Sequence, residues 1–209
     1  MVRKAIAHGI NREEIVTTLF EGGLAQACAT PLPPSVPGYS EELEAEAPGF
    51  DVEAAKALLE EAGWVEGDDG IREKDGQKLA PELYTNTSTT FGQLATLIQG
   101  QLRNIGMDVQ INQLEMAALL DFTPKGEHDM LLLSWGWSDP DVLYLFLSTD
   151  RLETSNRVHY SNPEFDELLV KGQQTLDQEE RMKVYYDAQK ILLEDLPWVP
   201  LYMPIIKTA

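Results

Sequence analysis

Two tryptophans and two aspartates follow an apolar run in the middle of the chain. Residues 129–133 read Asp-Met-Leu-Leu-Leu, and residues 134–141 read Ser-Trp-Gly-Trp-Ser-Asp-Pro-Asp. The apolar run predicts a buried strand, and the residues after it predict a polar, aromatic-lined turn. Ligands of open α/β sheets bind beyond the carboxyl ends of strands, where indole rings offer flat surface at little entropic cost. We therefore expect the ligand-binding site at this turn.

The turn supplies most of the candidate ligand-binding residues, which are Trp135, Gly136, Trp137, Ser138 and Asp139. We expect the two tryptophans to point to opposite faces of the strand end, one into the core and one towards the ligand. A structural role competes for the aspartate, because an Asp before a Pro often caps a helix. In that interpretation Asp139 caps a helix that begins at Pro140 and continues through the apolar residues 142–147.

A second polar connection, residues 148–161, follows that helix. It contains Asn156 and Arg157, which we add to the candidate ligand-binding residues. Asn162 and Pro163 then have the pattern of a helix start, with the asparagine as cap and the proline in the first turn.

An enzyme is the rival function. Asp139 and Asp141 flank a proline and lie close in sequence, as paired carboxylates of a hydrolase would have to lie in space. Glycosidase carboxylates, however, normally come from separate elements. The sequence also lacks the nucleophile, zinc-protease and phosphate-loop motifs. The three histidines, His8, His128 and His159, have no metal-ligand spacing. We expect no enzymatic activity, no metal and no cofactor.

Composition excludes further classes of protein. The formal net charge is −19 over 209 residues, which argues against a nucleic-acid partner because phosphates would be repelled. Cys28 is the single cysteine, so no internal disulfide can form, and its alanine neighbours indicate a small buried or loop residue. No apolar run reaches the roughly 20 residues that a membrane span needs, and no signal peptide is evident. A helical pattern starts directly at Val2, from which we expect the chain to begin inside a domain.

Local signals place the remaining elements. Asn11, with Glu14 three residues later, predicts a helix start, and Asp51 predicts another. Residues 28–50 contain five prolines and predict a long irregular loop that lies over a neighbouring surface or lines a cleft. This loop also leaves open a third function, an interaction module that binds a protein partner.

The second half of the chain predicts an α/β fold. Two Asp-Gly pairs predict a small hairpin with charged, exposed strands around residues 71–73. A strand near 82–85, a helix over 91–105 and an alternating strand over 107–112 form a β-α-β unit. Asp177 with Glu180 predicts the start of a long helix, and residues 198–202 predict a final edge strand.

Several of these segments together resemble family 5 of the extracellular solute-binding proteins, the peptide-binding subunits of ABC importers. The resemblance covers nearly the whole chain. The matching segments also follow one another in the same order as in the family, which makes coincidence improbable. The matching segments are residues 2–7 with 10–16, 51–63 after the proline-rich loop, 135–141, 160–169, and 179–202.

The resemblance implies an α/β fold of the periplasmic-binding-protein-like II type, in which two lobes close on a solute. It implies that residues 1–209 form a single lobe, the C-terminal ligand-binding lobe, with a mixed sheet flanked by helices. The N-terminal lobe would then be missing. The implied partners are a peptide or other small solute and ABC permease subunits. The implied location is periplasmic or extracellular, with lipid anchoring possible in the full-length protein.

The turn departs from the pattern of peptide-binding members, in which an aspartate of a "WxxD" turn takes the α-amine of the ligand. Residues 135–141 are about two residues shorter than that pattern, and Asp139 matches its later Asp-Pro pair. The alternative ligands within the family are nickel complexes, sugars and opines. Trp135 occupies the tryptophan position of the pattern, so we expect Trp135 at the cleft and Trp137 in the core.

Overall fold

The computed structural model describes residues 1–205, and residues 206–209 of the expected lobe lie outside that range. In chain order the helices are α1 (Val2–Gly9), α2 (Arg12–Leu19), α3 (Glu41–Glu46), α4 (Val52–Glu61), α5 (Thr89–Arg103), α6 (Met116–Phe122), η1 (Thr123–Lys125), α7 (Val142–Leu147), η2 (Thr149–Arg151), α8 (Pro163–Gln174) and α9 (Gln178–Asp195). The strands are β1 (Ala25–Ala27), β2 (Val65–Glu66), β3 (Arg72–Lys74), β4 (Gln77–Lys78), β5 (Glu82–Asn86), β6 (Gln110–Leu114), β7 (Met130–Leu131) and β8 (Tyr202–Pro204).

The central sheet is parallel and has the strand order β6-β5-β7. Leu83 of β5 pairs with Ile111 of β6 on one side and with Met130 of β7 on the other. The chain crosses from β5 to β6 through α5, so the predicted β-α-β unit is confirmed. The α/β class is confirmed as well. Parallel and antiparallel pairing, however, lie in separate sheets, because β1 pairs with β8 and β2-β3-β4 forms its own antiparallel sheet.

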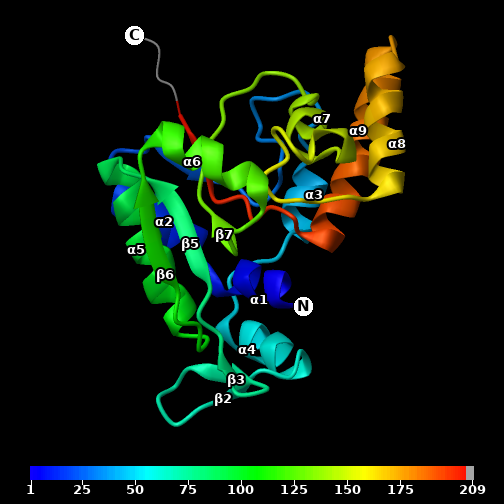
Figure 1. Cartoon of the computed structure of the whole chain (residues 1–209). Coiled ribbons are helices and arrows are strands. Elements are labelled where there is room, and N and C mark those ends of the chain that lie inside the picture. The colour runs from blue at the N-terminus through cyan, green and yellow to red at the C-terminus, as the bar shows by residue number, and fades with distance from the viewer. Residues whose placement is uncertain (206–209) are drawn as a thin grey trace.

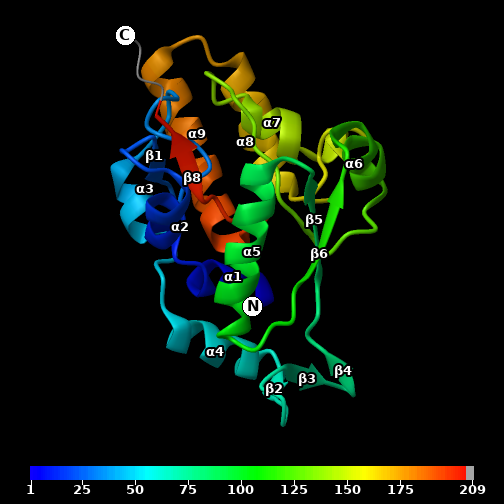
Figure 2. The same cartoon turned by 90° about the vertical axis from the view of Figure 1, so that its left-hand side faces the viewer.

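Two apolar clusters fill the interior. The first joins α1, α4 and α5 to the parallel sheet, with Leu83 and Leu102 almost completely buried. The second joins α7, α8 and α9, and includes Phe165 and Tyr185. Figure 1 shows the parallel sheet with α5 on one side of the molecule and α8 beside α9 on the other. In Figure 2 α4 and the small β2-β3-β4 sheet lie at the end of the molecule opposite to the described C-terminal strand.

The proline-rich loop of residues 28–50 is less irregular than predicted. Ser40 accepts a hydrogen bond from the Leu43 backbone N–H and starts the helix α3 inside it. Leu32 and Val36 of the loop are buried in the second apolar cluster. The loop therefore lies over a neighbouring surface, as expected, and it does so by contributing side chains to that cluster.

The small hairpin also differs from expectation at one residue. Its strands were expected to be exposed, but Arg72 is only 1% exposed. Its guanidinium donates to the carbonyl oxygens of Ile105 and Trp64, and it forms an ion pair with Glu60. Burial of a charged group requires such partners, and they lie on elements that the local pattern does not reveal.

Candidate functional site

The site turn begins where β7 ends. The strand β7 covers only Met130–Leu131, which are half-buried, so the buried strand predicted over 129–133 is shorter than expected. Leu132 continues along β5 for one more residue, because its N–H donates to the Tyr84 carbonyl and its own carbonyl accepts from the Thr85 hydroxyl. The chain then leaves the sheet at its carboxyl edge, where the sequence placed the site.

Both tryptophans of the turn lie at the surface. Trp135 is 46% exposed and Trp137 is 52% exposed, so the prediction that Trp137 enters the core is wrong. The physical reason is periodicity, since residues two apart in an extended segment share a face and cannot divide between core and solvent. Trp135 is anchored by stacking on Phe146 of α7, with ring centroids 4.3 Å apart. Between the tryptophans, Gly136 faces open space, and Ser138 is exposed.

Asp139 does not cap a helix at Pro140. The helix α7 begins at Val142, and Asp141 precedes it without a capping side-chain hydrogen bond. Asp139 instead closes a local turn, because its Oδ1 accepts from the Asp141 N–H at 2.9 Å. Proline at position 140 is buried within this turn.

The carboxylate of Asp139 is held by an arginine from α9. Arg181 donates from Nη1 to Oδ2 at 3.1 Å and from Nη2 to Oδ1 at 2.8 Å. The same Nη2 lies 3.2 Å from the carboxylate of Asp141, while Nε donates to the Gly172 carbonyl of α8 at 3.1 Å. Tyr185, one helical turn after Arg181, donates its hydroxyl to Asp141. This network ties the end of the turn to α8 and α9.

The network sets the charge of the two aspartates. Hydrogen bonding from Arg181 lowers the pKa of Asp139 and raises that of Arg181. Burial, followed by the hydrogen bond to Asp141, raises the pKa of Tyr185. A hydrolase needs one carboxyl group with a raised pKa as general acid, and Asp139 departs in the opposite direction. The negative charge of Asp139 is also neutralised by Arg181, so this carboxylate is a poor partner for a cationic ligand.

Asn156 lies inside the molecule and is 0% exposed. Its amide nitrogen donates to the carbonyl oxygens of Ser148 and Tyr160, and its Oδ1 accepts from the Tyr160 N–H. These bonds close the polar connection of residues 148–161 into a fixed loop. The side chain therefore supports the neighbouring Arg157 from within.

Arg157 is the residue of this loop that reaches the turn. Its guanidinium carbon lies 5.7 Å from the centroid of the Trp135 ring, a cation–π distance. The structure thus brings together Trp135 and Arg157, two of the predicted site residues that lie 22 positions apart in the numbering. Sequence reasoning missed Phe146, Arg181 and Tyr185, and the four-residue spacing of the last two on one helix was the only available signal.

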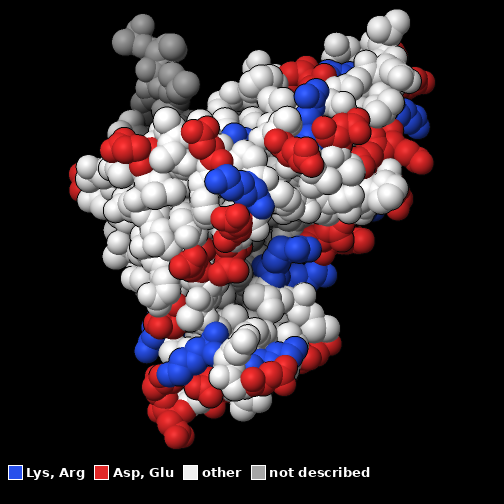
Figure 3. Space-filling view, viewed as in Figure 1, with Lys and Arg blue, Asp and Glu red and all other residues white. Residues whose placement is uncertain are grey.

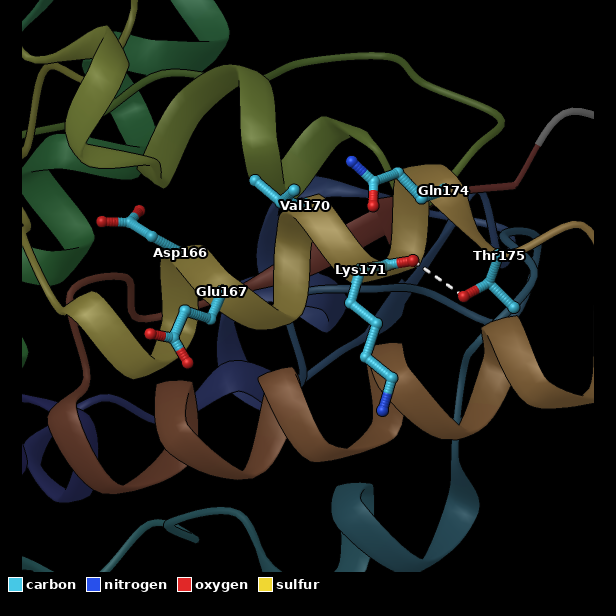
Figure 4. Close-up of a pocket in the computed structure, with 6 residues that line it drawn as sticks. All are labelled: Asp166, Glu167, Val170, Lys171, Gln174 and Thr175. Atoms are coloured by element: carbon cyan, nitrogen blue, oxygen red, sulfur yellow. Dashed lines mark hydrogen bonds between the residues drawn. The ribbon is translucent and has the colours of Figure 1, made fainter.

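The surface has two further features, its charge distribution and a groove on α8. Figure 3 shows acidic side chains spread over one face, with basic side chains gathered in a few places between them. Figure 4 shows a shallow groove whose lining residues, among them Val170, Lys171 and Thr175, all come from α8 or its end. Within residues 1–205 no group of three histidine, cysteine or acidic side chains is arranged to hold a metal ion. Among the same residues no helix has the length and apolar character to cross a membrane.

Comparison with known proteins gives consistent matches. The family described as "Bacterial extracellular solute-binding proteins, family 5 Middle" matches residues 1–154. "Di/tripeptide-binding protein 2" of Pseudomonas aeruginosa is 36% identical over all of this chain, which covers 38% of that protein.

Solved structures agree in fold. The oligopeptide-binding protein AppA of Bacillus subtilis, in complex with a nonapeptide, superposes with a TM-score of 0.87 at 30% identity. The match covers 97% of this chain and 41% of the AppA chain. NikZ of Campylobacter jejuni, in complex with Ni(L-His), has a TM-score of 0.85 at 28% identity. That match covers 97% of this chain and 41% of the NikZ chain. The chain thus spans about two fifths of the length of the relatives it matches.

Proposed function

Because the chain belongs to family 5 of the bacterial extracellular solute-binding proteins, we propose that it forms the C-terminal ligand-binding lobe of the solute-binding component of an ABC importer. In this proposal residues 1–209 act as a single lobe, and a second, N-terminal lobe of the same protein completes the cleft. The solute is a peptide or a similar small molecule. The protein works in the periplasm or outside the cell and delivers its solute to permease subunits in the membrane.

The observation that carries this proposal is the pair of half-exposed tryptophans at the carboxyl edge of the parallel sheet. Trp135 and Trp137 place large aromatic surface in solvent directly after β7. Two half-exposed indole rings two residues apart offer flat surface that suits the apolar side chains or the backbone of an extended peptide. Gly136 between them leaves room for a ligand to approach the backbone.

A peptide is favoured over other solutes because two relatives, at 36% and 31% identity, bear di/tripeptide-binding names. A non-peptide solute is the second candidate. It is supported by the similarity to NikZ with its nickel–histidine complex and by the pairing of Asp139 with Arg181, which removes a free carboxylate for a peptide amine. In either case the tryptophans contribute the apolar part of the contact.

The test uses the full-length protein that carries this chain, purified without denaturation. Mass spectrometry of the released small molecules identifies what the protein retains, and calorimetry then compares pooled di- and tripeptides, nonapeptides and Ni(L-His). Peptide binding at micromolar affinity supports a peptide as the solute. Binding of Ni(L-His) without peptide binding supports a non-peptide solute instead.

Two variants locate the contact. Trp135→Ala should weaken binding by roughly tenfold or more, since the aromatic surface that the bound solute would cover is lost. Leu176→Ala is the matched control, because Leu176 is 96% exposed and lies between α8 and α9, away from the turn. Equal affinity in both variants would remove the tryptophan turn from the site.

A further inference from the structure

Arg157 is a cation without an anion. Among residues 1–205 no carboxylate lies within 4.0 Å of its guanidinium. Its Nε is buried and has no hydrogen-bond partner, and its Nη1 reaches only the Ser155 carbonyl at 3.4 Å. The side chain is held mainly by its position against the ring of Trp135.

Three other arginines of the chain, all largely buried, have acceptors for their guanidinium groups. Arg12 donates to two backbone carbonyl oxygens, Arg72 has an acidic partner besides its carbonyl acceptors, and Arg181 binds two carboxylates. Arg157 has neither arrangement, although the chain contains 35 acidic residues. Arg151 of the same loop also has a buried Nε without a hydrogen-bond partner, but it stacks on Tyr144 and not on a tryptophan of the turn. Burial alone lowers the pKa of Arg157, with no opposing charge to restore it. Removing a cation from water without a counter-ion costs free energy, and binding of an anion would offset that cost.

The aspartates next to the turn cannot serve as that anion. Arg181 engages both Asp139 and Asp141, and Tyr185 donates a further hydrogen bond to Asp141. Among Asp139, Asp141, Arg157 and Arg181, the charge without a counter-ion is therefore the positive charge of Arg157, in a chain whose overall charge is −19. The local electrostatics favour an anionic group of the solute over a cationic one.

We propose that Arg157 binds a carboxylate of the solute, with the ring of Trp135 as the platform beside it. The inference rests on the proposed solute-binding function and specifies its chemistry: the solute is recognised in this lobe through an anionic end. A guanidinium suits this role because its planar donors match the two oxygens of a carboxylate. For a peptide, the recognised group is the C-terminal carboxylate or an acidic side chain, and the free amine is dispensable here.

The first test uses the 209-residue chain and acetate as the probe. The Nε–H resonance of Arg157 is followed by ¹⁵N NMR while acetate is raised to roughly 0.1 M at constant ionic strength, because a single carboxylate contact gives millimolar affinity or weaker. A saturable shift with acetate and none with chloride is expected. A response that is absent, or equal for both anions, overturns the proposal.

Variants assign the response. In Arg157→Gln the indole N–H resonance of Trp135 should no longer respond to acetate, whereas Arg157→Lys, which keeps the charge, should retain a weaker response. Arg151→Gln is the matched control. Arg151 belongs to the same loop, has a buried Nε without a hydrogen-bond partner and stacks on a ring, but that ring is Tyr144, whose hydroxyl donates to Asp150. If the acetate response is lost in Arg151→Gln and intact in Arg157→Gln, the anion binds at Arg151 and the proposal is refuted.

The second test separates this inference from the proposed function. Peptides that bind the full-length protein are compared as free acids, as C-terminal amides and as N-acetylated forms. For peptides without acidic side chains the amide should bind roughly tenfold more weakly than the acid, because a charge-assisted contact is lost. The N-acetylated form should bind like the free acid. Equal binding of acid and amide would refute the role of Arg157 while leaving peptide binding intact. Failure of every peptide, with the acetate response preserved, would refute the peptide and retain the anion site.

Discussion

The contact between Arg181 and the aspartates of the turn contributes to the free energy of unfolding, and replacing the arginine measures that contribution. Replacing Arg181 with methionine keeps most of the side-chain volume and removes two donors to Asp139, one ion pair with Asp141 and the bond to the Gly172 carbonyl. Arg181 is 15% exposed, whereas the side chains of Asp139 and Asp141 are 44% and 38% exposed.

The magnitude lies between two limits. Breaking a fully buried pair costs about 3–5 kcal/mol, and an exposed pair contributes only about 0.2–1 kcal/mol. Since both carboxylates retain more than a third of their exposure, solvent screening brings the loss towards the lower limit. We expect Arg181→Met to reduce the free energy of unfolding by about 2 kcal/mol, which for a chain of this size lowers the thermal midpoint by roughly 4–8 °C.

Urea unfolding of the 209-residue chain measures the loss, with an unchanged denaturant slope as evidence that compactness is preserved. Arg103→Met is the matched control. Its ion pair with Asp108 joins side chains that are 49% and 43% exposed, so it should cost no more than about 0.5 kcal/mol. In a double-mutant cycle, Arg181→Met and Asp139→Asn should couple by about 1 kcal/mol. Equal losses in Arg181→Met and Arg103→Met, or strict additivity in the cycle, would refute the reasoning.

The same pair gives a pH dependence of defined sign. The pKa of Asp139 is lowered in the folded chain, so the unfolded chain binds the proton more readily. The stability that Asp139 contributes is therefore fully present above its unfolded pKa, about 4, and is lost as the pH falls through the lower folded value. Asp139→Asn should be less stable than the natural chain at pH 7, and the difference should shrink below about pH 4. A difference that grows on acidification contradicts this assignment.

Three further outcomes are expected. Asn156→Ala should lower the free energy of unfolding by about 2 kcal/mol in urea titrations, because it leaves buried carbonyl groups of Ser148 and Tyr160 without their donor; no change would mean that water replaces the amide. Cys28 should react slowly with a thiol reagent in the folded chain and rapidly after unfolding, since it is 5% exposed and burial raises its pKa; equal rates would contradict its burial. The chain alone should bind peptides no more tightly than roughly millimolar, about −4 kcal/mol by calorimetry, because a cleft between lobes draws contacts from both sides; micromolar binding would contradict the two-lobe proposal.

The sequence alone determined the features whose partners lie a few residues apart. The helix caps Asn11, Asp51, Asn162 and Asp177 accept backbone hydrogen bonds two or three residues ahead, as their spacing predicts. The β-α-β unit follows from apolar periodicity in the same way, and the position of the site turn follows from the end of an apolar run. Family membership was also accessible, because it depends on the order of such local segments along the chain.

Only the tertiary structure decided which side chains meet across the molecule. Arg181 lies 42 positions from Asp139, and no local pattern pairs one arginine of a helix with one aspartate of a distant turn. The burial of Asn156 and Arg72 depends in the same way on which elements cover them, since a polar residue in a sequence carries no mark of its exposure. The unpaired charge of Arg157 is the clearest case, because the lack of a partner is a property of three-dimensional surroundings and cannot be read from neighbours in the chain.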